Sequence, residues 1–183
     1  MTPIASGATS AYVTLPEPSQ TYANLRPARQ IPGVPTRYDG EGIDFIVVRE
    51  NIEDLYAGVE FNPVPDALAA ALSQLSKPFA HFAGLKGDEY AVSCKINTRK
   101  GSERIIEAAF AFARREGRKK VTIVHKANVV RATDGMFLEI AREVGARYPE
   151  IAFDEANVDA MTMWLLKNPL SYDVLVAPNL YGD

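Results

Sequence analysis

The sequence is poor in the residues that build disulfides and histidine-rich metal centres. Cys94 is its one cysteine, and His81 and His125 are its two histidines. A single cysteine excludes an internal disulfide and a cysteine-rich zinc site, and two histidines exclude a multi-histidine metal site. This cysteine usage is consistent with a reducing compartment, so we predict a cytoplasmic protein.

Long apolar runs and an excess of one charge are also missing. The longest apolar runs, such as Ile43–Val48, are far too short to span a bilayer. The first residues have neither the basic nor the apolar region of a secretory signal. A net charge of −3 gives no basic field that would attract nucleic acid or an acidic membrane. We therefore expect neither a nucleic-acid nor a membrane partner.

Three common motifs are absent. The sequence has no GxGxxG dinucleotide fingerprint, no P-loop and no GxSxG nucleophile elbow. Its functional chemistry must therefore be inferred from individual polar side chains and their positions along the chain.

The chain does have a regular alternation of strand-type and helix-type segments. The first forty residues are rich in Pro, Ser, Gly and Thr, which is typical of extended, turn-rich chain. Beyond them, hydrophobic patterning predicts strands at 43–48, 90–96, 121–124, 151–153 and 173–177. It predicts helices at 65–76, 102–115 (with Gly117 as C-cap), 133–144 (capped by Thr133 or Asp134) and 159–166. This alternation favours the α/β class.

Three arginines are candidates for binding an acidic substrate. Arg26 and Arg29 lie in LRPAR, and Arg49 follows a predicted strand directly. Arginine presents a planar fork that binds a carboxylate through two hydrogen bonds, so converging arginines would suit a di- or tricarboxylic acid. Ordinary structural ion pairs are the alternative.

Tyr56 and Lys126 are candidates for proton transfer. Lys126 lies just past a predicted strand, where α/β proteins place functional loops. A lysine there can act as a general base or stabilise charge, and a tyrosine can donate a proton. The alternative is a half-buried core tyrosine and a surface lysine.

Two aspartates are candidates for binding a cation. Asp159 begins a predicted helix and Asp183 follows the last predicted strand. Carboxylates without accompanying histidines suit a hard cation such as Mg²⁺ or Mn²⁺. The alternatives are a helix N-cap for Asp159 and a turn residue for Asp183. From these residues alone, the sequence indicates an α/β protein with groups for a carboxylate and a divalent cation.

Four blocks carry a family resemblance: TYANLRPAR (Thr21–Arg29), IDFIVVRENIEDLYAGVE (Ile43–Glu60), KKVTIVHKANVV (Lys119–Val130) and VDAMTMWLLKNPLSYDVLVAPNLYGD (Val158–Asp183). They resemble the β-decarboxylating dehydrogenases, which act on isocitrate, homoisocitrate, 3-isopropylmalate or tartrate. RENIEDLYAG is similar to the isocitrate form, because isopropylmalate enzymes usually carry a glycine pair in place of its Glu-Asp. The homoisocitrate form is the alternative within the family.

The resemblance implies a reaction and a set of roles. The reaction is oxidative decarboxylation of isocitrate to 2-oxoglutarate, a step of the tricarboxylic acid cycle, with NAD or NADP and Mg²⁺ or Mn²⁺. Implied roles are substrate binding for Ser10, Arg26, Arg49 and Asn128, protonation of the enolate carbon for Tyr56, deprotonation of the hydroxyl for Lys126, metal binding for Asp159 and Asp183, and cofactor binding for Thr2. In such enzymes the equivalents of Lys126 and Asp159 come from the neighbouring subunit. The resemblance therefore also implies a homodimer with a shared active site.

The resemblance also implies a fold and a position within it. We expect the central portion of an isocitrate/isopropylmalate dehydrogenase-like α/β fold, with 1–22 and 159–183 in the large domain, 23–158 mainly in the small domain, and an interface segment at about 60–90. The family's first strand with its glycine loop is not in this sequence. The next metal aspartate and the adenosine-binding loops, which the family places after Asp183, are not in it either. We therefore expect an internal fragment that is inactive alone.

Two residues depart from the family pattern. An alignment without gaps puts Pro16 where the family has a substrate-binding arginine, and proline cannot replace a charged fork. Tyr12 falls where isocitrate dehydrogenases commonly have asparagine. Three hypotheses stay open: an isocitrate dehydrogenase, a homoisocitrate, isopropylmalate or tartrate relative, and a non-catalytic subunit-type paralogue.

Overall fold

The structure is a computed structural model, and it describes residues 21–38, 40 and 42–183. Four residues discussed above, Thr2, Ser10, Tyr12 and Pro16, lie outside the described residues. Their implied roles therefore stay predictions.

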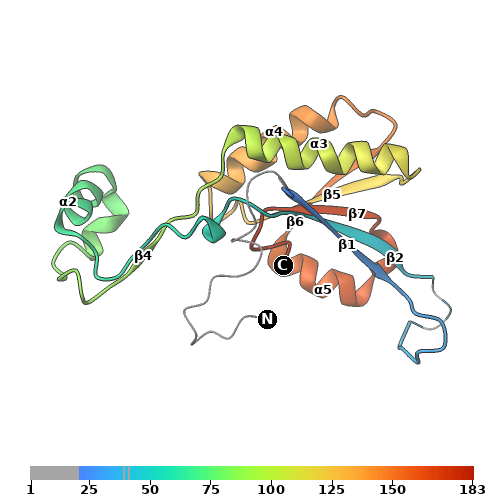
Figure 1. Cartoon of the computed structure of the whole chain (residues 1–183), viewed down its shortest axis with the longest axis horizontal. Helices are drawn as coiled ribbons and strands as arrows, with labels where there is room; N and C mark the ends of the chain where they lie inside the picture. Colours follow the sequence, from blue (N-terminus) through green and yellow to red (C-terminus); the bar gives the residue numbers. More distant parts are fainter. Residues whose placement is uncertain (1–20, 39, 41) are drawn as a thin grey trace.

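A twisted five-stranded sheet forms the centre of the molecule (Figure 1). Its spatial order is β1 (Ala23–Arg29), β2 (Asp44–Glu50), β7 (Val174–Ala177), β5 (Lys120–His125) and β6 (Ala152–Asn157). The edge strand β1 is antiparallel to β2, and the other neighbours are all parallel. Parallel strands need helical crossovers, which cover the sheet on both faces. The predicted α/β class is confirmed.

Helices cover the two faces unequally (Figure 1). Helices α3 (Arg99–Arg115) and α4 (Thr133–Gly145) lie together on one face, and α5 (Val158–Lys167) lies on the other. The larger core lies under α3 and α4, where Phe110 and Phe137 are almost fully buried against the strands. A smaller core, which includes Met161 and Leu175, lies under α5. The covered sheet forms a rigid platform whose strand ends can hold a site.

Helix α3 shows how the local sequence sets an element. The Thr98 side chain caps its N-terminus by accepting a hydrogen bond of 2.9 Å from the Gly101 N–H. At the other end, Gly117 adopts a left-handed φ of +68°. The N–H of Arg118 then donates to the carbonyl of Ala113 at 2.8 Å, which satisfies a helix-end carbonyl. Glu116 is the C-cap, and Gly117, which we predicted as the C-cap, follows it directly and ends the helix.

The Gly117→Ala substitution tests this helix end. We expect it to lower the free energy of unfolding by about 1 kcal/mol, because a Cβ is strained at positive φ. Gly135→Ala is the matched control: Gly135 lies inside α4 without positive φ, and an added Cβ meets no atom within 4 Å. It should leave stability equal or higher. Denaturant titration of both variants checks this, and equal stabilities would contradict it.

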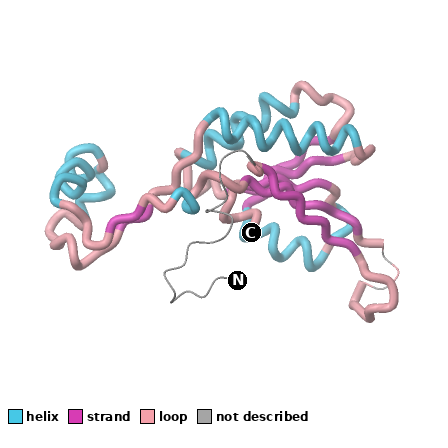
Figure 2. Tube along the Cα trace, in the orientation of Figure 1, coloured by secondary structure: helices cyan, strands magenta, loops and turns pink. Residues whose placement is uncertain are grey.

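An arm of residues 60–93 extends away from the sheet (Figure 2). It contains a short ladder of β3 (Glu60–Phe61) with β4 (Val92–Ser93), the helix α2 (Asp66–Leu75) and the 3₁₀ turn η3 (Lys77–His81). The prediction of helix 65–76 is confirmed. The strand predicted at 90–96 is too long, because only two of its residues pair in a ladder.

Three other local predictions differ from the structure. Strand β1 forms where we predicted extended, turn-rich chain and no strand, and it tolerates Pro27 because it is an edge strand. Strand β6 extends well beyond the predicted 151–153. Helix α4 has Ala132 as its N-cap, without a side-chain hydrogen bond, so Thr133 and Asp134 do not cap it.

The domain boundaries at residues 22 and 159 stay a prediction. Residues 159–183, which we assigned to the large domain, supply α5 and β7. Strand β7 pairs with β2 and β5 in the middle of the sheet, so it shares that sheet with the segment assigned to the small domain.

Across the part of the chain that the structure describes, none of the helices has the length and apolar character needed to cross a membrane.

Candidate active site

The predicted site residues gather at one edge of the sheet. Strands β2, β7, β5 and β6 run parallel, so their carboxyl ends lie at the same edge, where α/β proteins bind ligands. Arg49 is near the end of β2, Lys126 follows β5, Asp159 opens α5 just after β6, and Asp183 follows β7. Their side chains form two separate groups.

The first group surrounds the carboxylate of Asp183. The Tyr56 hydroxyl donates to Asp183 Oδ2 at 2.6 Å, and Arg26 Nη1 lies 3.2 Å from Oδ1. Arg49 forms an ion pair with the same Oδ1, and its guanidinium lies 5.1 Å from the centre of the Tyr56 ring. Two arginines and a tyrosine thus converge on one carboxylate, which is the chemistry predicted for binding an acidic substrate.

This arrangement controls the protonation of both partners. The hydrogen bond from Tyr56 lowers the pKa of Asp183 below its usual value, and the charges of Arg49 and Arg26 lower it further. The same hydrogen bond raises the pKa of Tyr56 above its usual value. Tyr56 therefore keeps its proton at neutral pH and remains a hydrogen-bond donor.

Two residues that sequence reasoning missed set the position of Arg49. Buried Asn179 accepts from Arg49 Nε at 2.9 Å and donates to the carbonyl of Glu53 at 3.1 Å. A Cβ on Gly182 would meet Arg49 Cβ and Cγ at 2.7 Å, so the loop approaches Arg49 closely only because this residue is glycine. Both residues lie in the string PNLYGD, and this string was the signal in the sequence that could have identified them.

The second group pairs Lys126 with Asp159. Lys126 Nζ lies 2.7 Å from Asp159 Oδ1, and this contact lowers the pKa of Asp159. Asp159 is not the N-cap of α5, because Asn157 occupies that position, so the alternative of an N-cap role is wrong. Asn128 lies exposed in the turn after β5, within three residues of Lys126.

Within the described part of one chain, no single cluster provides a cation site. Among residues 21–38, 40 and 42–183, no group of three or more His, Cys, Asp or Glu side chains could hold a metal ion. Asp183 is bound by the first group and Asp159 by Lys126. A hard cation would need more oxygen ligands than either aspartate brings alone.

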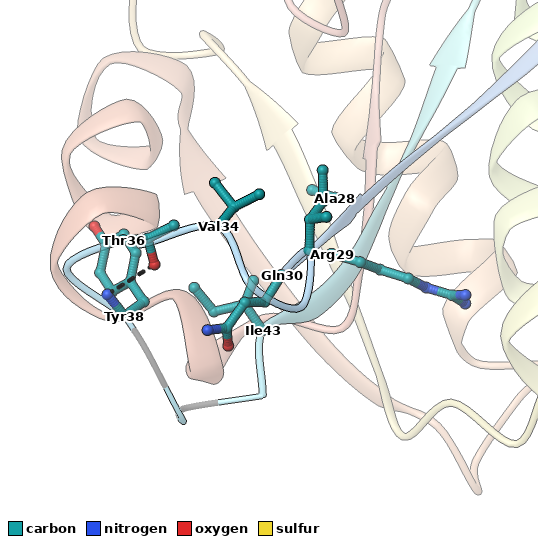
Figure 3. Close-up of a pocket in the computed structure, with 8 residues that line it drawn as sticks. Ala28, Arg29, Gln30, Val34, Thr36, Tyr38 and Ile43 are labelled. Atoms are coloured by element: carbon teal, nitrogen blue, oxygen red, sulfur yellow. Dashed lines mark hydrogen bonds between the residues drawn. The ribbon is translucent and has the colours of Figure 1, made fainter.

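A distinct hollow lies elsewhere (Figure 3). It is a cavity of about 280 Å³ between the end of β1 and the start of β2, lined by apolar side chains such as Ile31, Val34 and Ile43. Arg29 lines it and pairs with Asp44 at 2.9 Å. Arg29, which we grouped with Arg26 and Arg49, therefore lies at the opposite end of the strand pair from Arg49.

A comparison with known proteins decides the family. A family profile described as isocitrate/isopropylmalate dehydrogenase matches residues 2–183. The chain belongs to this family. It is 42% identical to NAD isocitrate dehydrogenase catalytic subunit 6, mitochondrial, of Arabidopsis thaliana, and 41% identical to 3-isopropylmalate dehydrogenase, chloroplastic, of Solanum tuberosum. In both comparisons all of this chain is covered, but only 42% and 44% of the relative.

Solved structures agree with the sequence comparison. The crystal structure of isocitrate dehydrogenase from Methylococcus capsulatus superposes with a TM-score of 0.81 at 43% identity. That match covers all of this chain and 48% of the other. The chain thus has the fold of part of an isocitrate dehydrogenase, as predicted, and spans less than half the length of the relatives it matches.

Proposed function

We propose that the full-length protein oxidatively decarboxylates isocitrate to 2-oxoglutarate with NAD or NADP. The observation that carries this proposal is the carboxylate of Asp183 held by Arg26, Arg49 and Tyr56. The two guanidinium groups can bind a substrate carboxylate through the same kind of contact. A fixed pair of guanidinium groups would orient the substrate for hydride transfer to the nicotinamide, whose carbon chemistry belongs to the cofactor.

Tyr56 and Lys126 divide the proton transfers in this proposal. Tyr56 keeps its proton because its pKa is raised, so it can protonate the enolate carbon after CO₂ leaves. Lys126 would assist removal of the hydroxyl proton during oxidation by stabilising the negative charge that develops on the oxygen, and the 2.7 Å contact with Asp159 fixes its ammonium group. Exposed Asn128, two residues after Lys126, would orient the substrate or the nicotinamide in this proposal.

The two groups act together across a homodimer in this proposal. Arg26, Arg49, Tyr56 and Asp183 of one subunit would complete their site with Lys126 and Asp159 of the partner subunit. Exposed apolar side chains support a subunit contact: Trp164 and Leu166 on α5, and Leu75 and Phe82 on the arm. The arm is thus the proposed interface segment, as predicted for about 60–90.

The same assembly would supply the cation site. Asp183 and Asp159 of the partner subunit would bring two oxygen ligands to Mg²⁺ or Mn²⁺, since within one chain each aspartate is paired with a different cationic residue. Such an ion polarises a carbonyl during decarboxylation.

A cytoplasmic location also stays a prediction, and the lone Cys94 is its only support. The names of two relatives place those proteins in mitochondria and chloroplasts.

A substrate panel tests the proposed reaction. The full-length protein is assayed for NADH and NADPH production with isocitrate, homoisocitrate, 3-isopropylmalate and tartrate, with and without Mg²⁺. We expect turnover with isocitrate and loss of activity when the cation is chelated. Preference for another of these acids would assign the protein to a different substrate class of the same family. Such a result would be consistent with Pro16 at the position of the family's substrate-binding arginine. No turnover with any of them would favour the non-catalytic subunit.

A further inference from the structure

The ammonium group of Lys95 is buried between two carboxylates, neither of which was a functional candidate in the sequence. It leaves the arm just after β4, and its ammonium nitrogen is shielded from solvent. Nζ lies 3.1 Å from Asp54 Oδ1 and 3.0 Å from Asp134 Oδ1. Both aspartates are fully buried, and the Tyr181 ring covers the ammonium at 4.5 Å. Removing Lys95 would leave two uncompensated buried charges, which a protein tolerates poorly.

Asp54 connects Lys95 to the first group of the site. It begins the 3₁₀ turn η2 (Leu55–Ala57), which carries Tyr56, and its Oδ1 accepts the Leu55 N–H at 2.8 Å. Its Oδ2 accepts the Leu180 N–H at 3.0 Å and so holds the loop that leads to Asp183. Asp54 also has a φ of +76°, a strained value that persists only when surrounding contacts hold it.

Asp134 connects Lys95 to the second group. It lies in the first turn of α4, where a cap would be expected, but its Oδ2 instead accepts the backbone N–H of Lys126 at 2.7 Å. That bond fixes the chain at the end of β5, where the Lys126 side chain departs toward Asp159. One ammonium group therefore bridges the two carboxylates that anchor the two groups.

We propose that Lys95 is a positioning residue that holds both groups of the site in fixed relation, through Asp54 for Tyr56 and Asp183 and through Asp134 for Lys126. One consequence rests on the proposed function. If the two groups serve different active sites of a dimer, Lys95 also links those two active sites within each subunit. A change at one active site could then reach the other through a single ammonium group.

Hydrogen exchange in the full-length protein tests the proposal without depending on activity. In Lys95→Met, we expect the amides of Lys126 and Leu180 both to exchange faster by about ten-fold or more, since each loses a charge-anchored acceptor. The amides of Ile123 and Val176 in the sheet should keep their rates. Lys100→Met is the matched control, because Lys100 is an exposed lysine in α3. It should change none of these rates.

Each exchange outcome decides the proposal. If Lys95→Met does not fold, Lys95→Gln, which keeps N–H donors without the charge, makes the same comparison. In the variant that folds, unchanged Lys126 and Leu180 rates would overturn the proposal, as would acceleration of only one of the two amides. A uniform rise in exchange rates that includes the amides of Ile123 and Val176 would show that Lys95 only stabilises the fold, and it would also overturn the proposal.

Kinetics provide a second readout where the full-length protein turns over isocitrate. We expect kcat to fall by about 10- to 100-fold in Lys95→Met, because small displacements of proton-transfer groups cost turnover. KM should change far less, because Arg26 and Arg49 remain to bind the carboxylates. A rise in KM with unchanged kcat would overturn the positioning role. Absence of activity in the wild-type protein would instead reject the proposed function and leave the exchange test to decide Lys95.

Discussion

Tyr56→Phe should lower kcat by about 10²- to 10⁴-fold, the usual contribution of a positioned acid. The substitution removes only the hydroxyl that donates to Asp183 at 2.6 Å. The ring stays beside the Arg49 guanidinium, so the arginines keep their geometry and KM should change little. Steady-state kinetics of isocitrate oxidation measure both constants.

A second tyrosine gives the control for this experiment. Tyr38 lies in the loop between β1 and β2, and its hydroxyl donates to the carbonyl of Leu166, away from the strand ends that hold the site. Tyr38→Phe should leave kcat near the wild-type value. A kcat for Tyr56→Phe within about two-fold of wild type would contradict a proton-donor role, because a lost acid costs far more.

Arg49→Met is expected to lower kcat/KM by about 30-fold or more, and up to several thousand-fold, as when one partner of a buried charge pair is truncated. Arg49 is 8% exposed, and it holds Asp183 and Asn179 together. Its loss would leave the Asp183 carboxylate with Arg26 and Tyr56 alone. The substrate would also lose one of two guanidinium groups, so we expect KM to rise.

Arg29→Met is the matched control, since Arg29 is also an arginine of the β1–β2 pair. Arg29 is mostly exposed and pairs with Asp44 at the other end of that pair. An exposed ion pair contributes little, so kcat/KM should stay near wild type. An equal loss in Arg29→Met and Arg49→Met would show that the effect is general to the strands, and would contradict a binding role specific to Arg49.

Hydrophobic patterning predicted the buried strands of the central sheet. The segments at 43–48, 121–124 and 173–177 became β2, β5 and β7, because their side chains are buried on both faces. The patterning failed at the edges. Strand β1 has polar side chains and a proline, and it pairs on one side only, so its composition is close to that of a loop.

The site was predictable where its residues lie in distinctive strings. Tyr56 and Asp183 belong to RENIEDLYAG and PNLYGD, and the structure brings them into contact. The contacts of Lys95 could not be predicted, because Asp54 and Asp134 lie far from it in sequence and meet it only in the folded chain. Asp134 illustrates the limit: its place in the first turn of α4 suggests a cap, but burial beside Lys95 gives it another partner.

The shared active site is tested most directly by co-expressing two inactive variants of the full-length protein. Tyr56→Phe disables the first group, and Lys126→Met disables the second. If each site combines the first group of one subunit with the second group of its partner, a mixed dimer has one intact site. Random pairing should then restore about a quarter of wild-type isocitrate oxidation. Activity no greater than the sum of the two variants measured alone would contradict the shared site.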